Sequence, residues 1–105
     1  MAIKNTQLTN TSVLQVFSAT SQMALTTVVF CNISASTNTT VNVFAVPYGS
    51  PINGSTQIMN ALPLAAGDTF VLDTERFILE QNDSIWAQST ASNCVTITVS
   101  SLATS

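Results

Sequence analysis

Hydrophobic and polar residues alternate with a period of two along the stretch from Leu64 to Ser89. The apolar pairs are Phe70 and Leu72, then Phe77 and Leu79, then Ile85 and Ala87. This period is typical of strands that bury one face. Gly67-Asp68 and Asn82-Asp83 separate the pairs, and these residue types favour turns. The stretch therefore predicts three short strands joined by turns that carry carboxylates.

The rest of the chain also has the pattern of strands. The candidates are Ser12–Ser18, Met23–Ile33, which is the longest β-rich run and is expected to be central, Thr40–Tyr48, and Val95–Ser101. Gln57–Leu62 fits either one helical turn or an edge strand before Pro63. Seven or eight short strands about a dozen residues apart predict an all-β, single-domain antiparallel β-sandwich of jelly-roll or Greek-key type. A small closed barrel is the competing architecture.

Residues 1–11 have few apolar anchors and predict an N-terminal arm or edge strand, followed by a sandwich domain over residues 12–105. The Thr40–Tyr48 strand is apolar on both sides. Val43 and Ala45 share one face, and Phe44, Val46 and Tyr48 share the other. One sandwich core buries only one face of a strand. The second face is expected to need a crossing loop or a partner subunit as cover.

Composition changes this picture mainly through charge. Only 7% of the 105 residues are charged, against a usual ~25%, and the net charge is −3. A free monomer normally carries more charge on its surface, so we expect neighbours to cover much of this one. With only Lys4 and Arg76 as cations, binding to nucleic acid is not expected. No apolar run approaches the length of a membrane span, and the N-terminus lacks the apolar core of a signal peptide.

Candidate chemistry is sparse. The chain has no histidine, the commonest general base and metal ligand, and its three glycines form no phosphate-binding loop. Five carboxylates could gather around calcium, but turn and solvated positions are the favoured interpretation. They are Asp68, Asp73, Glu75, Glu80 and Asp83. We therefore expect no catalytic residue, no enzyme activity, no cofactor and no metal.

The two cysteines are expected to be free thiols, because a reducing compartment is the favoured place of synthesis. Cys31 is in phase with Val29 and Ile33, as a small core residue would be, and Cys94 is expected to point away from the side that Val95 occupies. Trp86 alternates with Ile85 and Ala87, and so is predicted to point away from the core. It would then either lie flat on the sheet or anchor a subunit contact.

The whole chain resembles small virion structural proteins of tailed bacteriophages, of the cyanophage and marine phage type. The matching segments are AIKNTQLTNT, TTVVFCNIS, VNVFAVPYGS, the stretch through LPLAAGDTFVLDTERFILEQNDSIWA, and VTITVSS. The most specific part is Gly67-Asp68-Thr69, then Glu75, Leu79, and Asp83-x-Ile85-x-Ala87. The resemblance implies a component of the particle, assembled in the bacterial host cytoplasm, and it names no active site.

The first hypothesis is a capsid decoration or cement protein that forms a homo-oligomer, expected to be a trimer, and bridges capsomers of the major capsid protein. The residues expected at contacts are Ile3, Lys4, Phe44, Val46, Tyr48 and Trp86. One alternative is a component of the tail, neck or fibre base. Another is a carbohydrate-binding adhesion module, for which the exposed aromatic residues, only Tyr48 and Trp86, are few.

Overall fold

The computed structural model describes residues 2–72 and 77–103, and within these residues the chain forms nine β-strands. The strands are β1 (Ala2–Leu8), β2 (Leu14–Ser18), β3 (Met23–Asn32), β4 (Thr39–Val46), β5 (Gln57–Leu64), β6 (Thr69–Leu72), β7 (Phe77–Leu79), β8 (Ser84–Ser89) and β9 (Val95–Ala103). Three of the charged residues named above lie outside the described residues: Asp73, Glu75 and Arg76.

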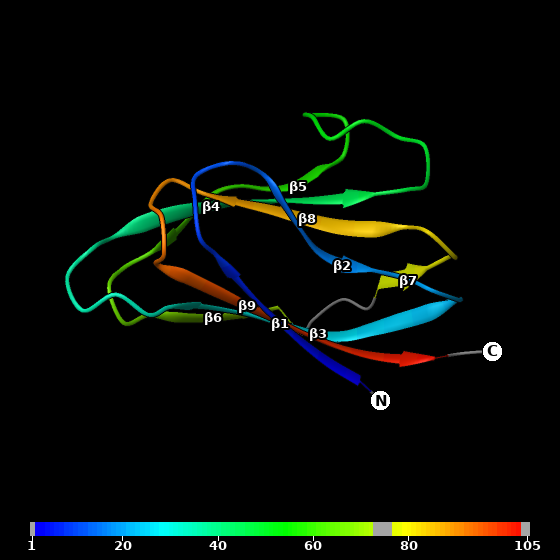
Figure 1. The fold of residues 1–105 in the computed structure, drawn as a ribbon, viewed down its shortest axis with the longest axis horizontal. Coiled ribbons are helices and arrows are strands. Elements are labelled where there is room, and N and C mark those ends of the chain that lie inside the picture. The colour runs from blue at the N-terminus through cyan, green and yellow to red at the C-terminus, as the bar shows by residue number, and fades with distance from the viewer. Residues whose placement is uncertain (1, 73–76, 104–105) are drawn as a thin grey trace.

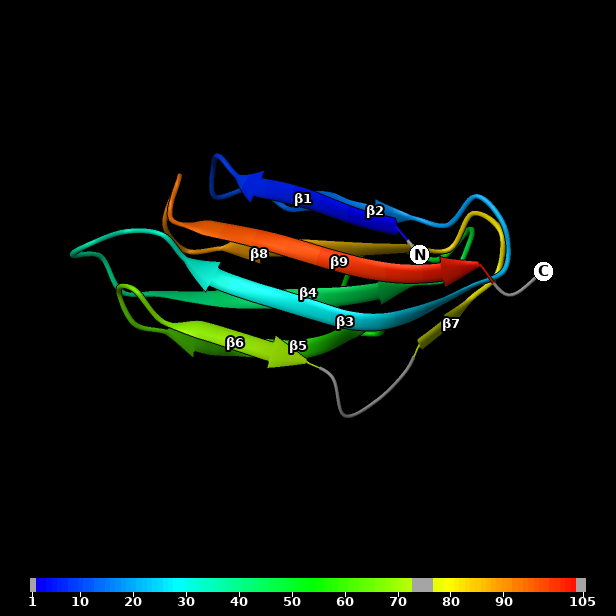
Figure 2. The same cartoon turned by 90° about the horizontal axis from the view of Figure 1, so that it is seen from below.

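The strands form two antiparallel sheets packed face to face, which confirms the predicted β-sandwich (Figure 1). One sheet has the order β1-β9-β3-β6, with β7 pairing beside β6 on the same edge of β3, and is called here the five-stranded sheet. The four-stranded sheet has the order β2-β8-β4-β5. Figure 2 shows the two layers from below, with the five-stranded sheet in front.

The pairing of strands is nested along the chain. β1 pairs with β9, β2 with β8, β3 with β6, and β4 with β5. Consecutive strands such as β1 and β2, or β3 and β4, lie in different sheets. A long hairpin wrapped in this way is a jelly roll. The nested order therefore selects one of the two sandwich topologies that the sequence left open.

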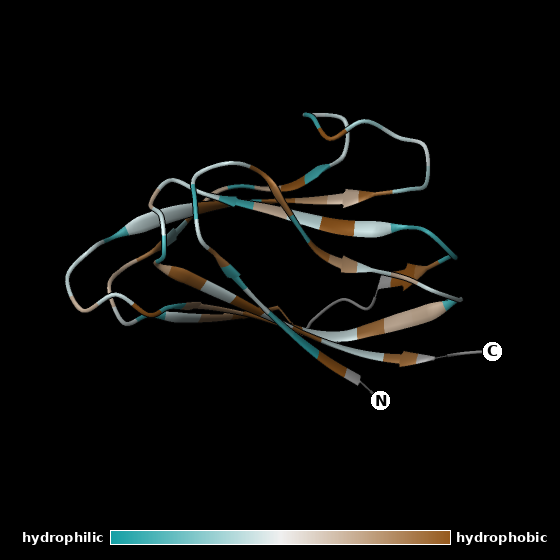
Figure 3. Cartoon of the chain, viewed as in Figure 1, coloured by the Kyte–Doolittle hydropathy of each residue, from teal (hydrophilic) through white to brown (hydrophobic). Residues whose placement is uncertain are grey.

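Alternation along the strands builds the core between the sheets. Val95, Ile97 and Val99 of β9 are fully buried and lie beside Val28 and Phe30 of the neighbouring strand β3 within one cluster. Figure 3 shows hydrophobic segments recurring along the strands of both layers, whereas the loops are mostly pale or polar. Completely burying side chains of this size stabilises the fold by roughly 1.5–3 kcal/mol each.

Buried Asn32 fixes the end of β3. Its side-chain amide donates to the carbonyls of Thr37 (2.9 Å) and Leu64 (3.0 Å), and its Oδ1 accepts from the N–H of Ser34. A buried amide with these partners avoids the cost of an unmade hydrogen bond. Asn32 therefore ties the loop after β3 to the end of β5.

Two details of the sequence interpretation are changed by the structure. Residues 57–64 form strand β5 at the edge of the four-stranded sheet, with Pro63 inside the strand, and the helical alternative is wrong. The two cysteines are free, but their surroundings are the reverse of those expected. Cys31 is half-buried on the outer side of β3, because its neighbours Phe30 and Asn32 point inward. Cys94 is buried in the core, because it lies in the turn before β9, where strand alternation does not apply.

Candidate functional site

The six predicted contact residues fall into three places. Ile3 (70% exposed) and Lys4 lie on edge strand β1, and Tyr48 (76% exposed) lies in the loop after β4 near half-buried Trp86 of β8. Phe44 and Val46 are each only 7% exposed. These two residues offer little surface to a partner. The structure thus brings Tyr48 and Trp86 together and separates both from the β1 pair, and their contact roles stay predictions.

The outer face of the five-stranded sheet is the first candidate surface, and it is called here the Thr-rich face. Its positions alternate with the buried ones of the same strands. They are Ile3, Asn5 and Gln7 on β1, Thr96, Thr98, Ser100 and Leu102 on β9, Ala24, Thr27, Val29 and Cys31 on β3, and Thr69, Val71 and Ile78 on β6 and β7. None of these side chains is charged.

Polar groups of the Thr-rich face bond to one another across strands. The Thr98 hydroxyl donates to Asn5 Oδ1 at 2.7 Å, and the Thr26 hydroxyl, at the bulge of β3, donates to Ser100 Oγ at 3.1 Å. Cross-strand pairs of this kind stabilise a sheet. The same face exposes large apolar side chains: Leu102 is 45%, Val71 46% and Ile78 57% exposed. The result is an uncharged surface suited to a dry contact.

The outer face of the four-stranded sheet is built differently. Phe44 of β4 is directly opposite Trp86 of β8, and neither belongs to the core cluster between the sheets. Residues 47–56, which connect β4 to β5, rise over this face (Figure 1). Phe44 and Val46 are each only 7% exposed, so the protein's own chain covers this side of β4, and the loop lies over the same face of the sheet.

Between this loop and the sheet lies an open hollow of about 450 Å³, called here the Trp86 hollow. Its lining combines two aromatic residues, aliphatic groups of the loop and uncharged polar side chains. The lining residues are Gln15, Val46, Pro47, Tyr48, Gly49, Ser50, Ile52, Asn82, Ser84 and Trp86. The indole N–H of Trp86 donates to Ser84 Oγ at 2.8 Å, which fixes the orientation of the ring. Sequence analysis did not single out Gln15, which carries no motif, and it named Asn82 only as a turn residue.

Asp83 holds the wall of the Trp86 hollow in place. Its Oδ1 accepts from the backbone N–H of Tyr48 at 2.8 Å, and its Oδ2 accepts from the backbone N–H of Glu80 at 3.0 Å. Bonds from backbone amides to a carboxylate are about twice as strong as neutral ones. Asp83 therefore links the Tyr48 loop to the turn before β8, a structural role that matches its predicted place in a turn.

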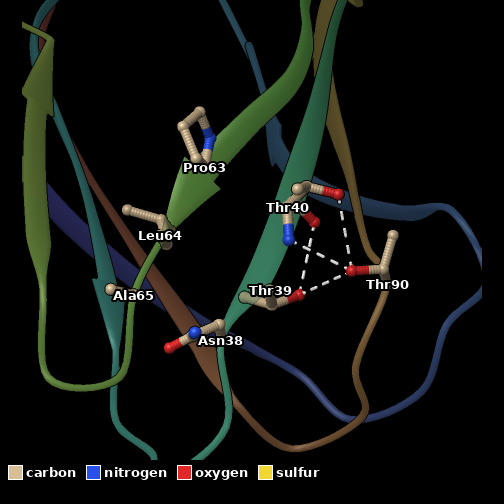
Figure 4. Close-up of a pocket in the computed structure, with 7 residues that line it drawn as sticks. All are labelled: Asn38, Thr39, Thr40, Pro63, Leu64, Ala65 and Thr90. Carbon is tan, nitrogen blue, oxygen red and sulfur yellow. Dashed lines mark hydrogen bonds between the residues drawn. The ribbon is translucent and has the colours of Figure 1, made fainter.

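A second recess, of about 320 Å³, lies at the far end of the four-stranded sheet and is drawn in Figure 4. Its hydroxyl groups bond one another: Thr39 Oγ1 lies 2.9 Å from Thr90 Oγ1 and 2.8 Å from Ser89 Oγ, and the N–H of Thr40 donates to Thr90 Oγ1. Groups already paired in this way have little capacity left for a ligand. We assign this recess to closure of the sheet end.

The acidic residues do not assemble a metal centre in the part of the chain that the structure describes, where no group of three or more possible ligands occurs. Asp68 lies in the turn from β5 to β6, where its N–H donates to the carbonyl of Ala65 and Gly67 adopts a φ of 78°. Across residues 2–72 and 77–103 there is also no helix long and apolar enough to cross a membrane.

No family model and no curated protein sequence matches this chain. Among solved structures, the chain is similar to one in the acidic stable capsid structure of Helicobacter pylori bacteriophage KHP30, with a TM-score of 0.54 and 14% identity over 98% of this chain and 91% of that one. At this identity the likeness shows a shared fold.

Two further solved structures align with lower scores. One is a CBM35 from Paenibacillus barcinonensis, with a TM-score of 0.49 and 9% identity over 91% of this chain and 73% of that one. The other is the structure of infectious bursal disease virus strain Gx, with a TM-score of 0.39 and 8% identity over 96% of this chain and 32% of that one.

Proposed function

We propose that this protein is a structural component of a bacteriophage virion, which attaches to the capsid through the Thr-rich face. The observation that carries the proposal is the character of that face: a regular sheet surface with no charged side chain among its described residues and with Val71, Ile78 and Leu102 exposed. Exposed apolar surface without charge marks protein contacts, because such contacts bury little that must remain hydrated.

The fold is consistent with this role. Jelly rolls are frequent in viral capsid and lectin domains, although a fold alone never fixes a function. The similar chain in the KHP30 capsid structure aligns over nearly its full length, so a small protein of this shape occurs in at least one phage capsid. The resemblance of the sequence to virion proteins of tailed phages points the same way.

A decoration or cement role is the specific form of the proposal, with several copies joined around junctions of the major capsid protein. The edges of the two sheets differ in how readily they could pair with a strand of another copy. β2 has a register shift between Gln15 and Phe17, β5 has two shifts together with Pro63, and β6 and β7 are only four and three residues long. Such features protect an edge from pairing with other strands.

β1 lacks these features within the described residues. All seven residues of β1 keep an unbroken register with β9, and its charged residue is Lys4. An edge of this kind can accept a strand from a neighbouring chain through backbone hydrogen bonds. We therefore place Ile3 and Lys4 at the contact between copies, and a trimer is the expected assembly. The proposal includes no catalytic activity.

Reassembly on particles tests the proposal. Particles of the encoding phage made without this protein are mixed with purified chain, sedimented, and analysed for bound protein. Wild-type protein should saturate a fixed number of sites on the head. The double variant Val71→Asp with Leu102→Asp should bind at least about tenfold less, because it adds two charges to a dry contact.

The matched control is Thr37→Asp together with Ile33→Asp, which adds the same charges to exposed residues of the loop after β3. The control should bind like wild type, and circular dichroism should show that all variants are folded. Unchanged binding of the Val71 and Leu102 variant would contradict the docking face. Binding along the tail, seen by electron microscopy, would support the tail or neck alternative over a capsid decoration protein.

A further inference from the structure

The Trp86 hollow has a chemistry that attachment to a capsid does not use. It lies on the four-stranded sheet, on the opposite side of the sandwich from the Thr-rich face. The geometry points to this hollow as a binding site for a neutral carbohydrate, with Trp86 and Tyr48 as the stacking residues. The inference is independent of the virion role. If the virion role and this inference are both correct, the hollow faces away from the particle surface and is open to glycans in the medium.

Two aromatic residues provide the apolar part of the site. Tyr48 is almost fully exposed at the rim, and Trp86 is half-buried against the sheet with its N–H bonded to Ser84. The face of an aromatic ring carries partial negative charge, and it attracts the partly positive C–H groups on one side of a sugar ring. An exposed Tyr and a fixed Trp at one hollow therefore suit a flat, amphipathic ligand.

Uncharged polar groups stand beside the aromatic residues. Within the described part of the chain, the side-chain amides of Gln15 and Asn82 have no hydrogen-bond partner, and both line the hollow. Each amide offers a donor and an acceptor on one plane. This arrangement matches pairs of neighbouring sugar hydroxyls, which also donate and accept. The recess at Thr39 and Thr90 differs, because its hydroxyl groups are already paired.

The electrostatics of the hollow select a neutral sugar. No lining residue is charged, and Asp83 and Glu80 are the nearby charges in the adjacent turn. Both oxygens of Asp83 already accept backbone N–H groups, so this carboxylate supports the wall. A uronic or sialic acid would meet these carboxylates, and no described residue that lines the hollow is a cation that could offset the repulsion. The described cation, Lys4, lies on β1 of the other sheet.

The loop that carries Tyr48 is held before any ligand arrives. Asp83 fixes the N–H of Tyr48, the N–H of Ser50 donates to the carbonyl of Pro47 at 3.0 Å, and the N–H of Ala45 donates to the carbonyl of Thr56 at 2.9 Å. A preformed wall reduces the entropy lost on binding. The volume of about 450 Å³ lies within the usual range of about 300–1,000 Å³ for small-molecule sites. A site of this size suits a short oligosaccharide better than it suits the surface of a partner protein.

Titration of the purified chain with defined glycans tests the inference. The neutral probes are maltohexaose, cellohexaose, chitohexaose and mannohexaose, and the acidic probes are sialyllactose and hexagalacturonate. Trp86 is the single tryptophan of the chain, so a change in its fluorescence reports on the hollow itself. At least one neutral probe should bind with a Kd between about 10 μM and 1 mM, and the acidic probes should bind more weakly.

Variants separate stacking from other effects, with affinity measured by calorimetry. Tyr48→Ala and Gln15→Ala should each weaken binding about tenfold, and Tyr48→Phe should retain it, because the ring remains. Ile33→Ala changes an exposed residue (51%) elsewhere and should leave the affinity unchanged. Tyr48 is exposed, so its replacement tests the site even if Trp86→Ala fails to fold.

The inference is overturned if no neutral probe binds at millimolar concentration. It is equally overturned if an acidic probe binds more tightly, if Tyr48→Ala and Gln15→Ala bind as well as wild type, or if the hollow is filled by another protein in intact particles. These outcomes are distinct from failure of the capsid test, which changes only Val71 and Leu102 on the other side of the molecule.

Discussion

The two sheets each bury one face in the same core, yet their outer faces differ. The Thr-rich face is open, uncharged and bonded across its strands through pairs such as Thr98 and Asn5. The outer face of the four-stranded sheet holds larger apolar residues, Phe44 and Trp86, and the loop 47–56 rises over this face. A strand that is apolar on both sides can have its second apolar face covered either by its own chain or by another chain. Here the chain covers one sheet and leaves the other exposed.

The largest expected effect is a difference between the two faces in the free energy of unfolding that a substitution costs. Phe44→Ala should lower the free energy of unfolding by about 3 kcal/mol, because Phe44 is only 7% exposed and its removal leaves a cavity. Val71→Ala on the Thr-rich face should cost less than about 1 kcal/mol, since Val71 is already half exposed. Chemical denaturation measures both. Equal losses would show that the loop does not complete a second core.

A smaller loss of stability is expected when the hydrogen bonds that hold the loop 47–56 are weakened. Asp83→Asn removes the charge that accepts the N–H groups of Tyr48 and Glu80, and should lower the free energy of unfolding by about 1.5–2 kcal/mol. Asp68→Asn is the matched control in another turn, and should change stability by less than about 0.5 kcal/mol. If the two variants behave alike in denaturation, Asp83 does not hold the loop.

The smallest effect concerns the edges of the sheets. Ala61 in β5 has a φ of 55°, a left-handed conformation that costs a residue with a Cβ about 1 kcal/mol or more. Ala61→Gly should therefore raise the free energy of unfolding by roughly 0.5–1 kcal/mol. Ala35→Gly, in the loop after β3, should lower it by a similar amount. The same sign for both variants in thermal or chemical unfolding would contradict strain at this irregular edge.

Much of the fold could be predicted from local patterns. Strict alternation at Val95, Ile97 and Val99 gave a strand whose apolar side is buried, and Trp86 points away from the core as its neighbours Ile85 and Ala87 indicated. Alternation predicts burial here because each strand has one inward face. The buried face follows from the period of two alone, whichever strand pairs with it.

Other features depend on partners that are distant along the chain. The bulge in β2 buries both Val16 and Phe17, which simple alternation would place on opposite sides. The Trp86 hollow requires Tyr48, Trp86 and Gln15 to meet, and this follows from the register of β8 with β4 and β2. No local signal in the sequence encodes that register, so the two aromatic residues appeared too few for a carbohydrate-binding module.

The position of β9 between β1 and β3 has a consequence for folding during translation. β1 is made well before β9, its ladder partner among the described strands, so Leu8 is synthesised long before Val95, with which it pairs. The five-stranded sheet cannot close until synthesis has passed residue 103, and pairing across such sequence distances is slow, in about milliseconds to seconds. During translation the β1 edge is therefore unprotected, and nascent chains crowded on one messenger would be exposed to mispairing there.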